Sequence, residues 1–203
     1  MTLRLTLTAL AATLALSACS STPTHYYTLI APMSANTPAA SSTAPLQFEM
    51  LPVLMPVQVD QPPLVVRQGN GSLAILDAER WGSPLGDEFH DALTAHLERR
   101  FGSRDMAGLP KNTDQPVLSV RTDVRRFESV ANSYALIDVV WTLSLRSTGT
   151  KRQNLTCSSI IREQAGIGME NLVLAHQRAL SRLADNIAKT AGAWAQQTST
   201  RCL

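Results

Sequence analysis

Residues 134–146, Y-A-L-I-D-V-V-W-T-L-S-L-R, carry an apolar side chain at every second position. Successive side chains of a β-strand point to opposite faces, so a period of two places these side chains on one face of an extended chain. The stretch therefore predicts a long strand with one buried face. The side chains on that face are Ala135, Ile137, Val139, Trp141, Leu143 and Leu145.

Further strands are predicted on both sides of this stretch. Pro116 to Phe127 precedes it, and Leu155 to Arg162 follows it after a turn. Nearer the N-terminus, Asn70-Gly71 predicts a hairpin turn, because both residues tolerate positive φ. The shorter strands predicted in this half are His25–Leu29, Leu46–Val53, Leu64–Arg67 and Ser72–Leu76.

Two helices are predicted from apolar side chains spaced three and four residues apart. The first covers residues 84–101, with Ser83 as its N-cap, Pro84 as its first helical residue and Gly102 at its end. The second covers about residues 169–197. These elements predict an α+β fold: a mostly antiparallel sheet with the two main helices packed on one face, forming a two-layer sandwich.

The N-terminus has the features of a bacterial lipoprotein signal. Arg4 precedes an uncharged apolar run that is too short to cross a bilayer as a helix, and Leu16-Ser17-Ala18-Cys19 follows. The peptidase requires small residues before the cut, and the Cys19 thiol carries the lipid, palmitate among its acyl chains. The alternatives are an ordinary secretory signal with a chance cysteine, or a plain N-terminal helix.

Cleavage before Cys19 defines three regions. We expect residues 1–18 to be removed, residues 19–24 to form a lipidated tether and residues 25–203 to form one domain. Ser20 stands where an Asp would favour the inner membrane, so the prediction is a lipid anchor in the outer membrane, facing the periplasm.

The charge balance argues against a nucleic-acid binder. Of the chain's 18 basic and 16 acidic residues, only Arg4 falls in the removed segment, so the mature chain is nearly neutral. A nucleic-acid binder would show a basic patch or stripe. Cys157 and Cys202 remain as an even pair in an oxidising compartment; a disulfide between them and two free thiols are both consistent with the sequence.

Motifs for catalysis or cofactors are scarce. No Gly-x-Ser-x-Gly, P-loop, dinucleotide fingerprint or CxxC occurs in the sequence. His90 and His96 are six residues apart, a spacing that does not place two metal ligands on one helix face. The acidic residues of the first helix are expected on a solvated face. They are Asp87, Glu88, Asp91 and Glu98.

The chain resembles the ABC-type transport auxiliary lipoproteins, and within them the paraquat-inducible C-subunit (PqiC-like) lipoproteins. The resemblance covers essentially the whole mature chain. It is carried by the sequence around Cys19, by Tyr26-Tyr27-Thr28-Leu29, by residues 60–67 and most sharply by Glu79-Arg80-Trp81-Gly82-Ser83-Pro84-Leu85, which is similar to an Arg-Trp-x-x-Pro-Leu core. Two departures, Gln61 before the Pro pair and Gly82 after the Trp, concern the details of an interface.

The resemblance implies a non-catalytic, outer-membrane-anchored auxiliary subunit of an MCE-type lipid transport system that supports envelope integrity. Its implied partners are a PqiB-like MCE-domain protein, through it an inner-membrane complex, and further copies of itself; no cofactor, metal or catalytic residue is implied. Candidate interface residues are Arg67, Arg80 and Trp81, although the sequence favours a Trp81 that closes the core edge and is covered by the Arg80 stem.

Two other functions remain open from the sequence. A lipid carrier would hold its cargo between the sheet and the last helix, where small side chains leave room or, alternatively, allow tight contact; these are Ala179, Ala184, Ala188 and Ala191. A periplasmic hydrolase would need an acid–histidine pair, such as Asp87 or Asp91 with His90, in a pocket.

Overall fold

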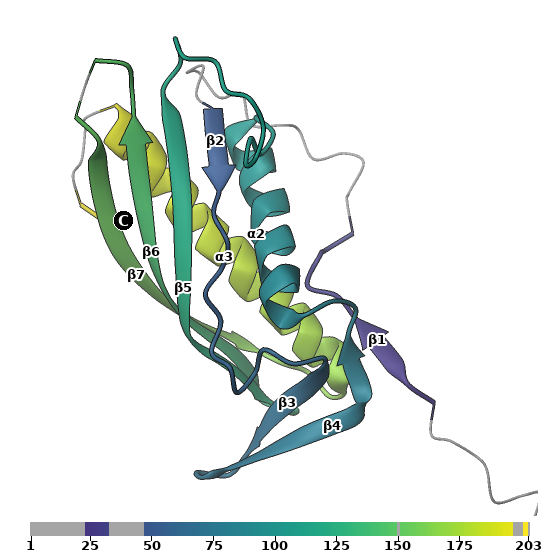
Figure 1. Cartoon of the computed structure of the whole chain (residues 1–203). Coiled ribbons are helices and arrows are strands. Elements are labelled where there is room, and N and C mark those ends of the chain that lie inside the picture. The colour runs from purple at the N-terminus through teal and green to yellow at the C-terminus, as the bar shows by residue number, and fades with distance from the viewer. Residues whose placement is uncertain (1–22, 33–46, 150, 197–200, 203) are drawn as a thin grey trace, which may run out of the picture.

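The structure is a computed structural model, and it describes residues 23–32, 47–149, 151–196 and 201–202. The described chain contains seven strands and two helices, which form two sheets with the helices packed against them (Figure 1). In chain order they are β1 (His25–Tyr27), β2 (Gln47–Met50), β3 (Pro63–Gln68), β4 (Ser72–Trp81), α2 (Leu85–Phe101), β5 (Val117–Val130), β6 (Tyr134–Arg146), β7 (Gln153–Gln164) and α3 (Met169–Ala195).

The larger sheet has the order β2-β5-β6-β7. The long strands β5, β6 and β7 pair antiparallel, and β2 adds to the free edge of β5 in parallel. The alternation predicted for residues 134–146 is confirmed, because the side chains from Ala135 to Leu143 on the expected face are all buried. A register shift between Val124 and Arg126 keeps the end of β5 in phase with the core, so that Phe127 and Ser129 face inward.

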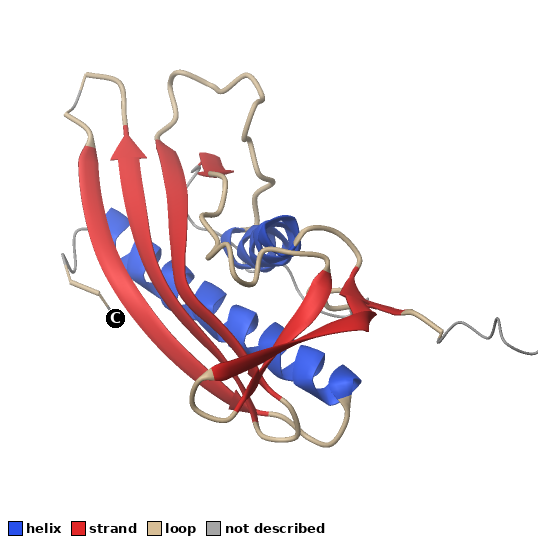
Figure 2. Cartoon of the chain, turned by 60° about the horizontal axis from the view of Figure 1, so that its bottom comes forward, coloured by secondary structure: helices blue, strands red, loops and turns tan. Residues whose placement is uncertain are grey.

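Both helices cover one face of this sheet, as predicted. α3 packs along β6 and β7, and α2 packs beside it (Figure 2). The α2 end is confirmed at Gly102, which adopts the left-handed conformation that glycine tolerates best. Its start differs from the prediction: Pro84 occupies the N-cap position, and Ser83 makes other bonds described below.

The smaller sheet has the order β1-β4-β3 and crosses one end of the large sheet (Figure 2). β3 and β4 form the antiparallel hairpin predicted around Asn70-Gly71, and β1 joins β4 in parallel. Its inner face packs on β6 and α3 through a small apolar cluster of Val66, Ala135, Leu172 and Ala175.

The α+β class and the mostly antiparallel pairing are confirmed, since three of the five strand pairs among the described residues are antiparallel, but the strands do not form a single sheet. The strands divide into two sheets, and each sheet has one parallel pair. The physical reason is that β1 and β2 are short segments separated by long connections from the strands they pair with, so neither is bound to the antiparallel geometry that a tight hairpin imposes.

Candidate docking surface

The junction between β4 and α2 contains the Arg-Trp-Gly-Ser-Pro-Leu sequence. Trp81 is only 4% exposed and packs edge-on against Phe127, with the ring centroids 6.1 Å apart. The Gly82 N–H donates to the Tyr27 carbonyl at 2.8 Å. A Cβ at Gly82 would stand 3.2 Å from a carboxylate oxygen of Glu88, so this position requires close backbone approach.

Glu88 ties three segments together at this junction. One of its carboxylate oxygens accepts bonds from the Thr28 hydroxyl at 2.7 Å and the Leu29 N–H at 2.8 Å. The other accepts from the Ser83 N–H and hydroxyl, each at 3.1 Å. The expected solvated position of Glu88 is therefore wrong: the carboxylate is buried because it satisfies backbone N–H groups that the segment after β1 and the start of α2 leave unpaired.

A second polar contact holds β1 against β4. The Tyr27 hydroxyl donates to Glu79 at 2.6 Å, and the His25 ring lies 3.2 Å from the same carboxylate. Burial, reinforced by the bond to Glu79, raises the pKa of Tyr27 to about 12. Tyr27 therefore stays protonated and able to donate throughout the physiological pH range.

Arg67 and Arg80 lie on the outer face of the small sheet, whereas Trp81 lies in the core. The registers Arg67↔Leu73 and Pro63↔Arg80 place these side chains on the face turned away from α3. A shift in register between Pro63 and Leu64 changes which β4 positions face inward, so Trp81 points into the core although Leu76 also does. Of the three candidate interface residues, the structure thus leaves the two arginines accessible.

Arg67 belongs to a charged cluster around Glu128. Its Nε lies 3.0 Å from the Glu128 carboxylate, which also accepts from Arg126 at 3.1 Å and from the Tyr134 hydroxyl at 2.5 Å. Burial raises the pKa of Glu128, but these bonds outweigh it and hold the pKa below its usual value. The cluster borders a cavity of about 180 Å³ that Val65 and Leu73 also line.

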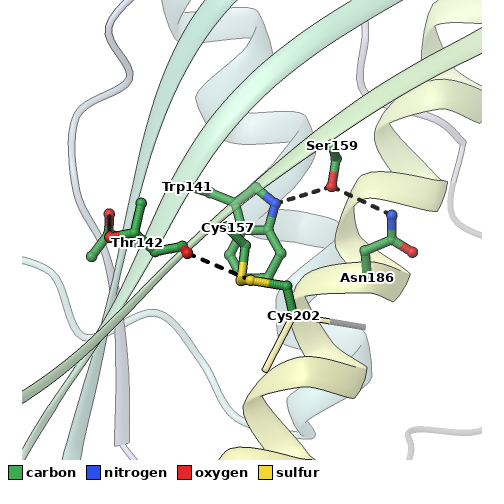
Figure 3. The surroundings of a disulfide bond; sticks show 7 residues. Trp141, Thr142, Cys157, Ser159, Asn186 and Cys202 are labelled. Carbon is green, nitrogen blue, oxygen red and sulfur yellow. Dashed lines mark hydrogen bonds between the residues drawn. A yellow bond between two sulfur atoms is a disulfide. The ribbon is translucent and has the colours of Figure 1, made fainter. Parts of the chain in front are cut away.

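Cys157 and Cys202 are bonded in the structure, with the sulfurs 2.00 Å apart and the Cα atoms 5.7 Å apart (Figure 3). The bond joins β7 to the segment after α3. Cys157 sits opposite Trp141 in the β6–β7 register, and the indole N–H of Trp141 donates to Ser159 at 3.1 Å. The disulfide therefore closes a loop of the chain that contains the rest of β7 and the whole of α3.

The buried pair most similar to a catalytic arrangement is Ser129 with His176. The Ser129 hydroxyl lies 2.8 Å from His176 Nε2, and the His176 ring stacks on Phe127 at 4.0 Å. Complete burial lowers the pKa of His176 to about 3, so the imidazole is a weak base at neutral pH. This pair is buried in the core.

The structure also places the residues considered for a hydrolase and for a lipid carrier. His90 contacts its neighbour Asp91 at 3.0 Å on the exposed side of α2. Within the described ranges, no three His, Cys, Asp or Glu side chains are grouped to hold a metal ion. Ala179 and Ala184 are fully buried in the core cluster, where their small size permits close helix–sheet packing.

The fold and these contacts define a two-sheet, two-helix α+β domain whose polar clusters bind segments of the chain to one another. The chain belongs to the ABC-type transport auxiliary lipoprotein component family, whose family model matches residues 27–188. It is thus an auxiliary lipoprotein component of a transport system. No helix among the described residues is long and apolar enough to span a bilayer.

Solved structures share the fold. One, described as an uncharacterized protein, is 20% identical with a TM-score of 0.62, covering 84% of this chain and 99% of its own. A second, from Xanthomonas campestris and described as a DUF330 family protein, is 18% identical with a TM-score of 0.58, covering 86% of this chain and 99% of its own. No curated protein matches the chain.

Sequence reasoning missed Glu88 and Glu128, the two buried carboxylates that organise this part of the molecule. For Glu88 a signal existed: it lies five residues after Ser83, at the start of a helix, where unpaired N–H groups are concentrated. For Glu128 no local signal existed, because Arg67 and Tyr134 reach it from other strands.

Proposed function

We propose that this protein is an outer-membrane lipoprotein, anchored through a lipidated Cys19, that serves as a non-catalytic auxiliary subunit of an MCE-type intermembrane lipid transport system. The observation that carries the proposal is the family match over residues 27–188, which covers α2, every strand from β2 to β7 and most of α3. Cys19 itself lies outside the described residues.

The geometry supports a docking role. Residues 20–24 span at most about 17 Å when fully extended, so a lipid on Cys19 holds the domain close to the bilayer. The strands β5 and β6 then extend the body away from β1, and 14 residues of β5 correspond to roughly 45 Å. A partner rising from the inner membrane needs a rigid shaped surface here, and paired long strands under two helices provide one.

The test is a mild-detergent pull-down of the tagged, lipidated full-length protein from its own membranes, with mass spectrometry of bound protein and lipid. We expect an MCE-domain protein in stoichiometric amount. The control is Cys19→Ala, which lacks the acylated thiol and should lose both membrane association and the partner. Bound lipid without a protein partner would support a carrier instead, and neither lipid nor partner would contradict both.

A further inference from the structure

The outer face of the small sheet carries three large apolar side chains that are about half exposed or more, whereas Val65 on the same face is only 8% exposed. Ile75 is 54% exposed, Leu73 is 49% exposed and Tyr26 is 68% exposed. The registers Arg67↔Leu73, Tyr26↔Arg80 and Pro63↔Arg80 place these side chains on one face together with the two arginines. We call this surface, formed by Tyr26, Arg67, Leu73, Ile75 and Arg80, the outer patch.

Few residues separate the proposed site of lipidation from the outer patch. From Cys19 to Pro23, the first described residue, four residue steps span at most about 14 Å. β1 begins two residues later and contributes Tyr26 to the outer patch. Figure 1 shows β1, β3 and β4 together at the same end of the molecule.

We infer that the outer patch lies against the phospholipid bilayer in which the chain is anchored. This inference rests on the proposed lipidation of Cys19 and adds to it the face that meets the lipid. Tyr26, Leu73 and Ile75 enter the boundary between headgroups and acyl chains, where an aromatic side chain with a polar tip is favoured and apolar side chains leave water.

The charges of the outer patch fit the headgroup layer. Arg67 and Arg80 stand among the apolar side chains, and a guanidinium binds phosphate through several N–H groups while its stem lies on apolar surface. Arg67 also pairs with Glu128, which Arg126 shares, so part of its charge is neutralised within the protein. The apolar side chains therefore provide most of the contact, and the arginines orient it.

A bilayer is favoured over a protein as the occupant because of the tether. A partner protein on the outer patch would have to fit between the sheet and a membrane held within a tether's length of β1. The exposed apolar side chains stand on adjacent strands, and at the Arg67 and Leu73 edge the outer patch borders the cavity shared with β5. A row of apolar side chains of this kind suits a bilayer surface, which presents no shape to recognise.

The experiment uses the full-length lipidated protein in vesicles of phosphatidylethanolamine and phosphatidylglycerol, with and without bromine on the acyl chains. Bromine quenches tryptophan fluorescence only at short range. The variant Ile75→Trp places a probe in the outer patch, and the matched control Leu109→Trp places one at the opposite end of the body, in a loop position that is 55% exposed. Both positions are exposed, so neither change threatens the core, and the unsubstituted protein gives the background of the buried native tryptophans.

We expect brominated lipid to quench the added fluorescence of Ile75→Trp and leave that of Leu109→Trp unchanged. If both proteins float with the vesicles and the tryptophan at position 75 is no more quenched than that at position 109, the orientation is wrong while the anchor stands. A protein partner covering the outer patch would give this same pattern. If the unsubstituted protein fails to float with the vesicles, both the lipid anchor at Cys19 and the contact of the outer patch with the bilayer are wrong.

Discussion

Breaking the Cys157–Cys202 bond should cost a large part of the stability of the domain. The change of choice is Cys202→Ser, because Cys202 is exposed whereas Cys157 is buried on β7. The two cysteines are 45 residues apart, and closing a loop of that length lowers the entropy of the unfolded chain by an amount worth about 4 kcal/mol at 25 °C. That is an upper value, since a compact unfolded chain has less entropy to lose.

The assay is urea unfolding of protein prepared from an oxidising compartment, followed by tryptophan fluorescence. Trp141 faces Cys157 across the β6–β7 pair, so its signal reports the region that the bond holds. With a slope of about 2 kcal/mol per M, the loss of about 4 kcal/mol moves the midpoint by roughly 2 M.

Two controls separate loop closure from a local effect. Reduced unsubstituted protein should unfold at the same midpoint as Cys202→Ser. Ser158→Ala, an exposed change beside Cys157 that keeps the bond, should unfold with the oxidised protein. Coincident midpoints for oxidised, reduced and Cys202→Ser protein would refute the reasoning, because closure of this loop would then contribute nothing.

Two other changes test the buried polar groups. Glu88→Gln puts an amide N–H₂ among groups that all donate, including the Leu29 N–H and the Ser83 hydroxyl. We therefore expect the free energy of unfolding in urea to fall by about 1–3 kcal/mol and proteolysis near β1 to become faster. Unchanged proteolysis would show that Glu88 does not hold β1 to the start of α2. Burial lowers the pKa of His176 from 6.5 to about 3. The neutral ring therefore contributes its full stability above pH 6.5. Below pH 6.5 the unfolded chain takes up a proton that the folded protein does not, so the free energy of unfolding falls, by about 2 kcal/mol at pH 5. His176→Gln should remove about that much of the difference in unfolding free energy between pH 8 and pH 5, and an unchanged pH profile would count against the assignment.

The long elements could be predicted from the sequence because each has its own period. Residues 134–146 alternate, and residues 84–101 and 169–195 repeat every three to four positions, so the face buried by each element follows from local pattern alone. The sequence likewise indicates the α2 end at Gly102, where a left-handed residue is needed.

What the sequence left open depends on contacts between distant segments. β4 continues to Trp81, whereas the sequence predicts its end at Leu76. The register shift opposite Pro63 changes which positions of the strand face inward. Because the prediction follows the alternation of apolar residues, it ends where that alternation is interrupted. The parallel partners of β1 and β2 could not be chosen from pattern, since a short strand fits several sheet edges equally well. Arg80 and Trp81 are neighbours in sequence, yet only the register shows that one faces solvent and the other the core.

The Arg-Trp-Gly-Ser-Pro-Leu sequence lies where β1 contacts the rest of the domain. β1 has three residues and pairs with β4 alone, so it is held by few backbone bonds. In the proposed function, any force between the lipid and the domain passes through β1. The contacts that resist it are the Gly82–Tyr27 bond, the carboxylate of Glu88 and the packing of Trp81 on the core. A docking subunit must keep its body fixed relative to the membrane while a partner binds, and a loose β1 would let the body turn on its tether. If Cys19 is lipidated as proposed, the sequence that first suggested a partner interface is better explained as the joint that holds the domain rigidly on its anchor.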